Sequence, residues 1–294
     1  MSADYHQGFN DRSIETSDGL ALHVRIYGEH LPGQPVVCLP GLTRNSRDFH
    51  QLALILSQSA NPSKVVTIDS RGRGLSDRDP DKSRYTLAVE ALDVIAVLDA
   101  LAIDRAAFIG TSRGGLILHL LAVSHPERLA AVVLNDIGPV IEVGGLKQIQ
   151  AYLGRERQPK DFDEAALLLK QVHGPGFPAL AAQDWRDMAD AIYREIDGKI
   201  VADFDSAIAE QFRAADLEQP LPDLWASFEA FAGVPLMAIR GETSRLLSAE
   251  TLAEMGGRHP ALASMTATGQ GHAPVLHLDG IAERILEFIA PLRG

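Results

Sequence analysis

The stretch AAFIGTSRGGLILHLL, residues 106–121, places one serine between glycines where an apolar run passes into a helical pattern. Residues 106–110 are typical of a buried strand, and the apolar spacing from residue 114 onward predicts a helix. A strand that turns at once into a helix holds the residue at the bend in a strained conformation, so its neighbours must be small. Gly110 and Gly114 provide this on either side of Ser112. The pattern therefore predicts that the Ser112 hydroxyl stands at the carboxyl end of a strand.

Strands and helices alternate on both sides of this stretch. Short apolar runs that end in turn residues predict strands at 35–41, 63–72, 129–136, 235–241 and 262–269. Helix-spaced apolar positions occur at 47–60, 85–103, 248–257 and 281–292. Alternating residues around Asp18-Gly19 predict a β-hairpin at the start of the chain. This order predicts an α/β fold with a mostly parallel central sheet flanked by helices on both faces.

The alternation breaks over residues 139–219. Helical patterns at 145–154, 163–172 and 184–196 are separated there by Gly/Pro segments, and we expect no strand among them. A segment of this length is too long for a loop. The sequence therefore predicts a core made of residues 1–138 and 220–294, interrupted by a helical insertion at 139–219.

Composition limits the classes of partner and compartment. The 294 residues are 46% hydrophobic and 22% charged, which is ordinary for a soluble protein, and the net charge of −12 argues against nucleic acid. The single cysteine, Cys38, excludes an internal disulfide, and no Cys/His/carboxylate spacing indicates a metal. We expect a cytoplasmic protein with no cofactor and no membrane partner, because neither a signal peptide nor a membrane span is evident. The sequence leaves homo-oligomer formation open.

A serine hydroxyl needs a base to act as a nucleophile near neutral pH. His272 lies in a turn after the last predicted strand, at the same carboxyl edge as Ser112, and we expect it to be that base. Other histidines are expected to cap, to pack or to face solvent: His119, His125, His173 and His277. A phosphate site at Ser112 is disfavoured, since a dinucleotide fingerprint needs glycine at this position and a P-loop needs Gly-Lys after its glycines.

Acyl chemistry at Ser112 also requires two fixed N–H donors for the oxyanion that forms. One is the amide of Arg113, the residue after the serine. The second is expected in the loop after the strand at 35–41, where the Leu42 amide is available. Gly41 is expected to permit an unusual backbone angle there, and Pro40 has no N–H to offer.

With these pieces the sequence resembles the α/β-hydrolase superfamily. The matching motifs are LPGLTRNSRDF at 39–49, DSRGRGLSDRDPD at 69–81, GTSRGG at 110–115 and GQGHAP at 269–274, in the order of that family. Within it, the motif LNDIGP at 134–139 is similar to that of a lid-bearing bacterial group with a serine nucleophile. The resemblance implies an α/β-hydrolase fold in which residues 139–219 form the lid, or cap.

The expected acid departs from the family pattern. The family usually places an aspartate in a G-x-x-S-D-L-L turn, but here the turn reads GETSRLL at 241–247 with Arg245 at that position. A cation cannot stabilise the imidazolium that forms during attack. Some members take the acid from the end of the strand after the nucleophile helix, which is Asp136 here, and we favour it. Glu242 is the other candidate, and a plain turn-forming role is the alternative for Asp136.

Arginines near the site have a structural and a functional interpretation. Asp69, Arg71 and Arg73 are expected to lock their own loop through hydrogen bonds. Arg44 and Arg113 flank the expected oxyanion site, where either could bind a substrate carboxylate. Internal pairing with the many acidic residues is the favoured interpretation of both.

The sequence as a whole predicts a serine hydrolase that cleaves a small or medium carboxylic ester or lactone through an acyl-enzyme. Ser112, His272 and Asp136 would form the catalytic triad, and Leu42 and Arg113 the oxyanion hole. Epoxide hydrolases and haloalkane dehalogenases are disfavoured, because they attack with a carboxylate. Two alternatives stay open: a ligand-binding or regulatory protein with little turnover, and a C–C, amide or thioester hydrolase that uses the same triad.

Overall fold

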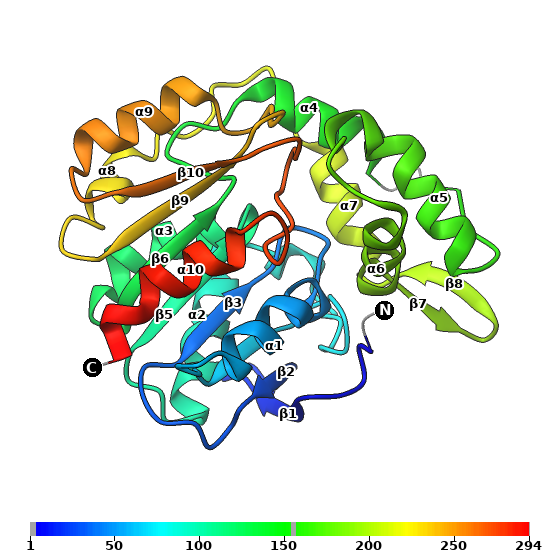
Figure 1. The fold of residues 1–294 in the computed structure, drawn as a ribbon. Helices are drawn as coiled ribbons and strands as arrows, with labels where there is room; N and C mark the ends of the chain where they lie inside the picture. The colour runs from blue at the N-terminus through cyan, green and yellow to red at the C-terminus, as the bar shows by residue number, and fades with distance from the viewer. Residues whose placement is uncertain (1–3, 154–156, 294) are drawn as a thin grey trace.

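The main sheet has the order β1-β2-β4-β3-β5-β6-β9-β10 in the computed structural model, which describes residues 4–153 and 157–293 (Figure 1). Its strands are β1 (Asn10–Glu15), β2 (Ala21–Tyr27), β3 (Val36–Leu39), β4 (Val65–Ile68), β5 (Ala106–Thr111), β6 (Leu129–Asn135), β9 (Leu236–Gly241) and β10 (Ala263–Ala267). Only β1 and β2 enter antiparallel, and from β4 to β10 every pairing is parallel. The predicted α/β fold with a mostly parallel sheet is confirmed.

Helices cover both faces of this sheet. Core helices are α1 (His50–Gln58), α2 (Leu87–Ala100), α3 (Arg113–Ser124), α8 (Trp225–Glu229), α9 (Ala249–Arg258) and α10 (Ile281–Ile289). Short 3-10 turns are η1 (Ser46–Phe49), η2 (Lys82–Arg84), η3 (Pro126–Arg128), η4 (Gly174–Gly176) and η5 (Ala290–Arg293). One apolar cluster joins the sheet to α2, α3, α8 and α9, and a second joins it to α1 and α10. None of the described helices is both long and apolar enough to cross a bilayer.

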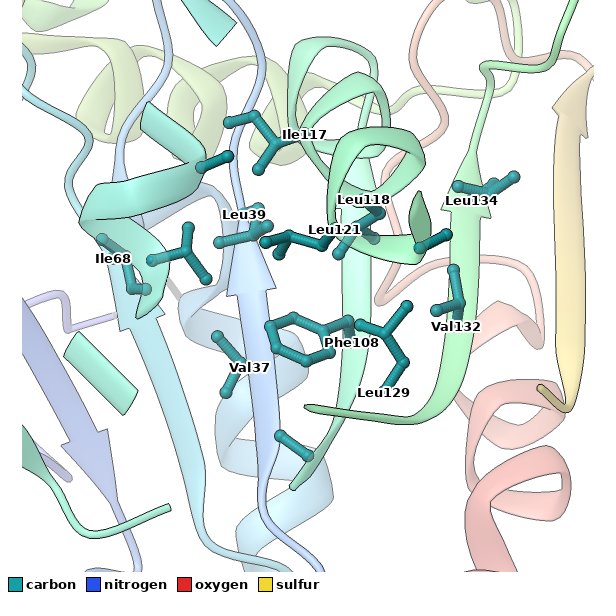
Figure 2. Close-up of a cluster of buried hydrophobic side chains, with 14 of the residues drawn as sticks. Val37, Leu39, Ile68, Phe108, Ile117, Leu118, Leu121, Leu129, Val132 and Leu134 are labelled. Atoms are coloured by element: carbon teal, nitrogen blue, oxygen red, sulfur yellow. The ribbon is translucent and has the colours of Figure 1, made fainter. Parts of the chain in front are cut away.

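Strand β5 shows why a continuous apolar run becomes a central strand. Its residues alternate between the two clusters: Phe108 packs on the α3 side, and Ala107 and Ile109 pack on the opposite side. A strand buried on both faces needs apolar residues at every position, which is what residues 106–110 supply. Figure 2 shows Phe108 among Val37 and Leu129 beneath helix α3. This packing fixes the end of β5, and therefore Ser112, relative to the sheet.

The chain between β6 and β9 adds no strand to the main sheet among its described residues. It forms α4 (Val143–Tyr152), α5 (Phe162–His173), α6 (Ala182–Ile192) and α7 (Ser206–Ala214), which gather at one end of the sheet in Figure 1. Its own apolar cluster includes Trp185, Phe177 and Leu169. This segment therefore packs internally as well as against the core.

The expectation that this segment holds no strand is wrong. Residues 193–202 form an antiparallel hairpin of β7 (Tyr193–Ile196) and β8 (Lys199–Ala202), so the helix predicted at 184–196 ends at Ile192. Asp197 and Gly198 both have positive φ, 51° and 72°, at the turn. An Asp-Gly pair with positive φ at both positions is the favoured two-residue hairpin turn. The turn chemistry therefore outweighed the helical spacing.

Backbone hydrogen bonds join this segment to the loop that follows β4. The Gly74 amide donates to the Asp203 carbonyl (2.9 Å), and the Asp205 amide donates to the Gly72 carbonyl (2.7 Å). The buried Asp203 carboxylate also pairs with Arg47 of η1 (2.8 Å). The loop after β4 is thus a fixed joint between the core and the segment 139–219.

Burial of His119 on α3 makes stability depend on pH. Its Nδ1 is 3.0 Å from the Ser227 hydroxyl and its ring lies against Phe231, and burial lowers the pKa of His119 to about 4. Between the ordinary pKa of 6.5 and about 4, the unfolded chain binds more protons at this site than the folded chain. We expect the free energy of unfolding to fall as pH falls through this window.

The variant His119→Gln removes this contribution. We expect the slope of the free energy of unfolding against pH to become shallower by up to about 1.4 kcal/mol per pH unit. Urea unfolding of both proteins at several pH values between neutrality and about 4 measures the two slopes. Equal slopes would contradict the assignment.

Candidate active site

Ser112 lies at a tight bend between β5 and α3. Its backbone angles are φ 52° and ψ −112°, and its amide donates to the Asn135 carbonyl on the neighbouring strand (3.0 Å). A Cβ added to Gly110 would lie 2.7 Å from the backbone carbon of Gly114, and one added to Gly114 would collide with the Leu39 carbonyl. Small residues are therefore required on both sides of the serine, as the sequence pattern indicates.

His272 joins Ser112 to Asp136 by two hydrogen bonds. Its Nε2 is 2.9 Å from Ser112 Oγ, and its Nδ1 is 2.8 Å from Asp136 Oδ2. Ser112 follows β5, Asp136 follows β6 and His272 follows β10, so all of them lie where parallel strands end. The structure thus brings together the three side chains that were predicted to act together, although they are far apart in the sequence.

Asp136 is held by more than the histidine. The carboxylate is fully buried, with Oδ1 accepting the Gly241 amide (2.8 Å) and Oδ2 accepting the Ser244 hydroxyl (2.6 Å). Its backbone has φ 54°, and its amide donates to the Ile239 carbonyl (2.7 Å). Hydrogen bonds to both oxygens fix the plane of the carboxylate and favour its charged form.

The turn after β9 supports Asp136 instead of supplying an acid. Ser244 donates to Asp136 and accepts the Leu246 amide (3.1 Å), which closes the turn. The side chain of Arg245 is exposed. Glu242, the other acid considered, is also exposed and accepts the Gly269 amide (2.6 Å). The departure at Arg245 therefore leaves the imidazole with a carboxylate partner.

Leu42 and Arg113 line the same cavity as Ser112. Among the hydrogen bonds of the described residues, neither of their amides has a protein acceptor. The expectation for Gly41 is wrong in one respect: its φ is not positive. A Cβ added there would make ordinary contacts with Arg44 (3.5 Å) and Ser112 (3.8 Å), so this loop touches the nucleophile without needing an unusual backbone.

Both arginines beside the proposed oxyanion donors are paired internally. Arg44 binds Asp48 through Nε and Nη2 (2.7 and 2.6 Å). Arg113 binds the buried Glu90 through Nε and Nη2 (2.8 and 2.9 Å). These pairs agree with the structural interpretation, so neither guanidinium is simply waiting for a substrate carboxylate.

The loop after β4 is locked more widely than predicted. Asp69 stays within its loop, where Oδ2 accepts the Leu75 amide (2.9 Å). Arg71 instead reaches helix α2 and binds Asp93 through two hydrogen bonds (2.7 and 2.6 Å). Arg73 likewise makes contacts outside the loop. The expectation of a self-contained lock is therefore too narrow for the two arginines.

A cavity of about 600 Å³ opens above Ser112 and His272. The segment 139–219 supplies much of its wall, including Phe177 and Tyr193, whereas Trp185 is buried behind them. His173 also lines the cavity, and burial together with the nearby Arg44 lowers its pKa to about 4. The ring is therefore neutral at pH 7, and the cavity suits an uncharged or weakly polar group.

Asn135 is a site residue that the sequence analysis missed. It lines the cavity, and its Nδ2 donates to Thr111 Oγ1 and to the Pro274 carbonyl, each at 3.0 Å. Since Pro274 is two residues after His272, this amide holds the loop that carries the imidazole. The signal was its position in LNDIGP, directly before Asp136.

Metal-ligating side chains do not gather at this site. Over residues 4–153 and 157–293, no group of three or more His, Cys, Asp or Glu side chains has the geometry to hold a metal ion. The hydrogen-bonded groups at the strand ends are therefore those from which its chemistry must be argued.

Comparison with known proteins agrees with this architecture. A 3-hydroxybutyrate-oligomer hydrolase from Cupriavidus necator is 32% identical over 284 residues, which cover 93% of this chain and 94% of that protein. A 2-(acetamidomethylene)succinate hydrolase from Mesorhizobium japonicum is 27% identical over 253 residues, covering 86% and 85%. The crystal structure of an alpha/beta hydrolase from Novosphingobium aromaticivorans matches with a TM-score of 0.89 at 39% identity, covering 96% and 98%. A family model described as the alpha/beta hydrolase fold matches residues 34–276, and the chain belongs to this family of hydrolases and esterases.

Proposed function

We propose that this protein is a serine hydrolase that cleaves small or medium carboxylic esters or lactones through an acyl-enzyme. The observation that carries the proposal is the chain of hydrogen bonds from Ser112 Oγ to His272 Nε2 (2.9 Å) and from His272 Nδ1 to Asp136 Oδ2 (2.8 Å). A serine within hydrogen-bond reach of a base that a third group orients is the arrangement that activates a hydroxyl. The apolar cavity above it gives the acyl group a place to bind.

Each residue then has a defined part in the reaction. His272 removes the Ser112 proton as Oγ attacks the ester carbonyl, and Asp136 holds the imidazolium that forms. The amides of Leu42 and Arg113 receive the negative oxygen of the tetrahedral intermediate. His272 gives its proton to the leaving alcohol, which breaks the ester bond and leaves the acyl group on Ser112. A water molecule, deprotonated by His272, then releases the acid.

Residues 139–219 act in this proposal as a lid that selects the acyl group. Phe177 and Tyr193 of this segment line the cavity, whose volume of about 600 Å³ lies in the range of small-molecule sites. The relative from Cupriavidus necator is named for hydrolysis of 3-hydroxybutyrate oligomers. Short esters of hydroxy acids are accordingly the first substrates to test.

Covalent labelling with product-release kinetics tests the proposal. We expect a fluorophosphonate to modify one serine per chain, identified as Ser112 by peptide mass spectrometry. With p-nitrophenyl esters, we expect a burst of p-nitrophenol equal to the enzyme present when deacylation is slower than acylation. A panel of acyl chain lengths, 3-hydroxybutyrate oligomers, lactones, amides and thioesters then defines the bond cleaved. An unreactive Ser112 together with no turnover on this panel would overturn the proposal and favour a binding protein.

A further inference from the structure

Glu90, on the inner face of α2, is a buried carboxylate to which two arginines donate. The residue is 2% exposed, and its Oε1 accepts Arg73 Nη1 and Arg113 Nη2, each at 2.9 Å. Its Oε2 accepts Arg113 Nε at 2.8 Å. Burial alone would raise the pKa of Glu90, but the two guanidinium groups hold it below its ordinary value, so the carboxyl is charged at neutral pH.

The first arginine extends this contact to the loop after β3. Arg73 Nε donates to the Leu42 carbonyl at 2.8 Å, which fixes one side of that residue. On the other side, the Gly41 carbonyl accepts the Arg44 amide at 3.2 Å. Carbonyl and N–H point to opposite edges of a planar peptide, so these two bonds set the direction of the Leu42 amide.

The second arginine extends it to the start of α3. The Arg113 side chain donates to Glu90 and, through Nη2, to the Tyr85 carbonyl at 3.1 Å. The Ser112 carbonyl, which shares a peptide with the Arg113 amide, accepts the amides of Gly115 (2.9 Å) and Leu116 (3.1 Å). The direction of this second amide is thereby also set.

We propose that Glu90 is a positioning residue for the oxyanion site, because it holds the segments that carry the Leu42 and Arg113 amides through Arg73 and Arg113. This inference rests on the proposed function. Donors that are fixed before the reaction need no reorganisation when charge develops, which is the main source of their effect on rate. Glu90 does not touch the substrate and acts only through its two partners.

Charge and geometry predict opposite results when Glu90 is neutralised. The group of Glu90, Arg73 and Arg113 carries a net charge of +1, and a glutamine at position 90 would raise it to +2. Added positive charge beside an oxyanion favours it by Coulomb's law. A loss of rate in Glu90→Gln therefore reports a loss of positioning.

Helix α2 also offers a matched control. Asp93, three residues after Glu90, is 5% exposed and binds Arg71 through two hydrogen bonds (2.7 and 2.6 Å). Neither member of this pair has a hydrogen bond to Leu42 or Arg113 among the described residues. Asp93→Asn breaks a buried ion pair on the same helix, so it carries a similar cost in stability without the link to the oxyanion site.

The experiment compares Glu90→Gln and Asp93→Asn in the full chain, with a p-nitrophenyl ester and a trifluoromethyl ketone, which forms an oxyanion when Ser112 adds to it. For Glu90→Gln we expect kcat to fall by on the order of 10²-fold with little change in KM, and the ketone to bind weaker by a similar factor. For Asp93→Asn we expect both values to stay within about threefold of wild type at a similar loss of melting temperature.

Two outcomes would overturn the inference: an unchanged kcat and ketone affinity in Glu90→Gln, or an equal loss in both variants. If Glu90→Gln does not fold, Arg113→Met tests the same link, since it keeps the backbone amide and removes one of its anchors. We then expect kcat to fall by about tenfold at constant KM, and no change in kcat would refute the inference. Failure of the proposed function is separate, because it would appear as an inactive, unlabelled wild-type protein.

Discussion

Ser112→Ala is expected to lower kcat by on the order of 10⁶-fold and to abolish labelling by a fluorophosphonate. The variant removes the oxygen that forms the acyl-enzyme, while His272, Asp136 and the cavity stay in place. The fold is expected to persist, because Ser112 donates its amide, not its side chain, to the Asn135 carbonyl. Steady-state kinetics on a p-nitrophenyl ester and intact-protein mass measure the two effects.

Contamination by other esterases sets the limit of this measurement. The variant must therefore be purified in parallel with the wild type and compared at equal melting temperature. Retention of more than about one hundredth of the wild-type kcat would show that another group carries the reaction.

Asp136→Asn is expected to lower kcat by on the order of 10⁴-fold, with KM nearly unchanged. Asp136 Oδ2 is the partner of His272 Nδ1, and an amide there would favour the wrong tautomer of the imidazole. The amide also cannot accept from both the Gly241 amide and the Ser244 hydroxyl as the carboxylate does. Steady-state kinetics over a range of pH measures the loss, and wild-type rates would remove Asp136 from the mechanism.

Arg245→Asp is the companion to that variant. It restores an aspartate at the position where the sequence motif leads one to expect it, on an exposed side chain. Because His272 already has a carboxylate partner in Asp136, we expect kcat to stay within about threefold of wild type. A large gain in rate would mean that the natural arrangement is impaired and that the vacated position matters.

The sequence was sufficient for the sheet because its strands are buried on both faces. Continuous apolar runs such as residues 106–110 admit one interpretation once helices flank them. It failed at residues 193–202, where helical spacing continued through a stretch whose Asp197-Gly198 turn favours a hairpin. Local turn chemistry decided that conformation, and the periodicity of the side chains gave no warning of it.

For the site, the sequence was informative where one residue type had one purpose. A small-flanked serine and a late histidine could be paired by their places at strand ends, and chain order left Asp136 as the acid. Ser244 and Asn135 could not be found, because polar residues in turns have many uses and only coordinates show which acceptor they face. Glu90 was missed for a similar reason: its partners lie 17 and 23 positions away along the chain.

The joint at Gly72 and Gly74 separates two tasks within one chain. Reacting groups stand on loops of the sheet, whereas side chains such as Phe177 and Tyr193 that shape the cavity belong to a segment with its own apolar cluster. Substitutions in that segment can therefore enlarge, narrow or reshape the space for an acyl group while the hydrogen bonds from Ser112 to Asp136 stay intact. Such a chain can acquire a new substrate preference by gradual change, without passing through inactive forms.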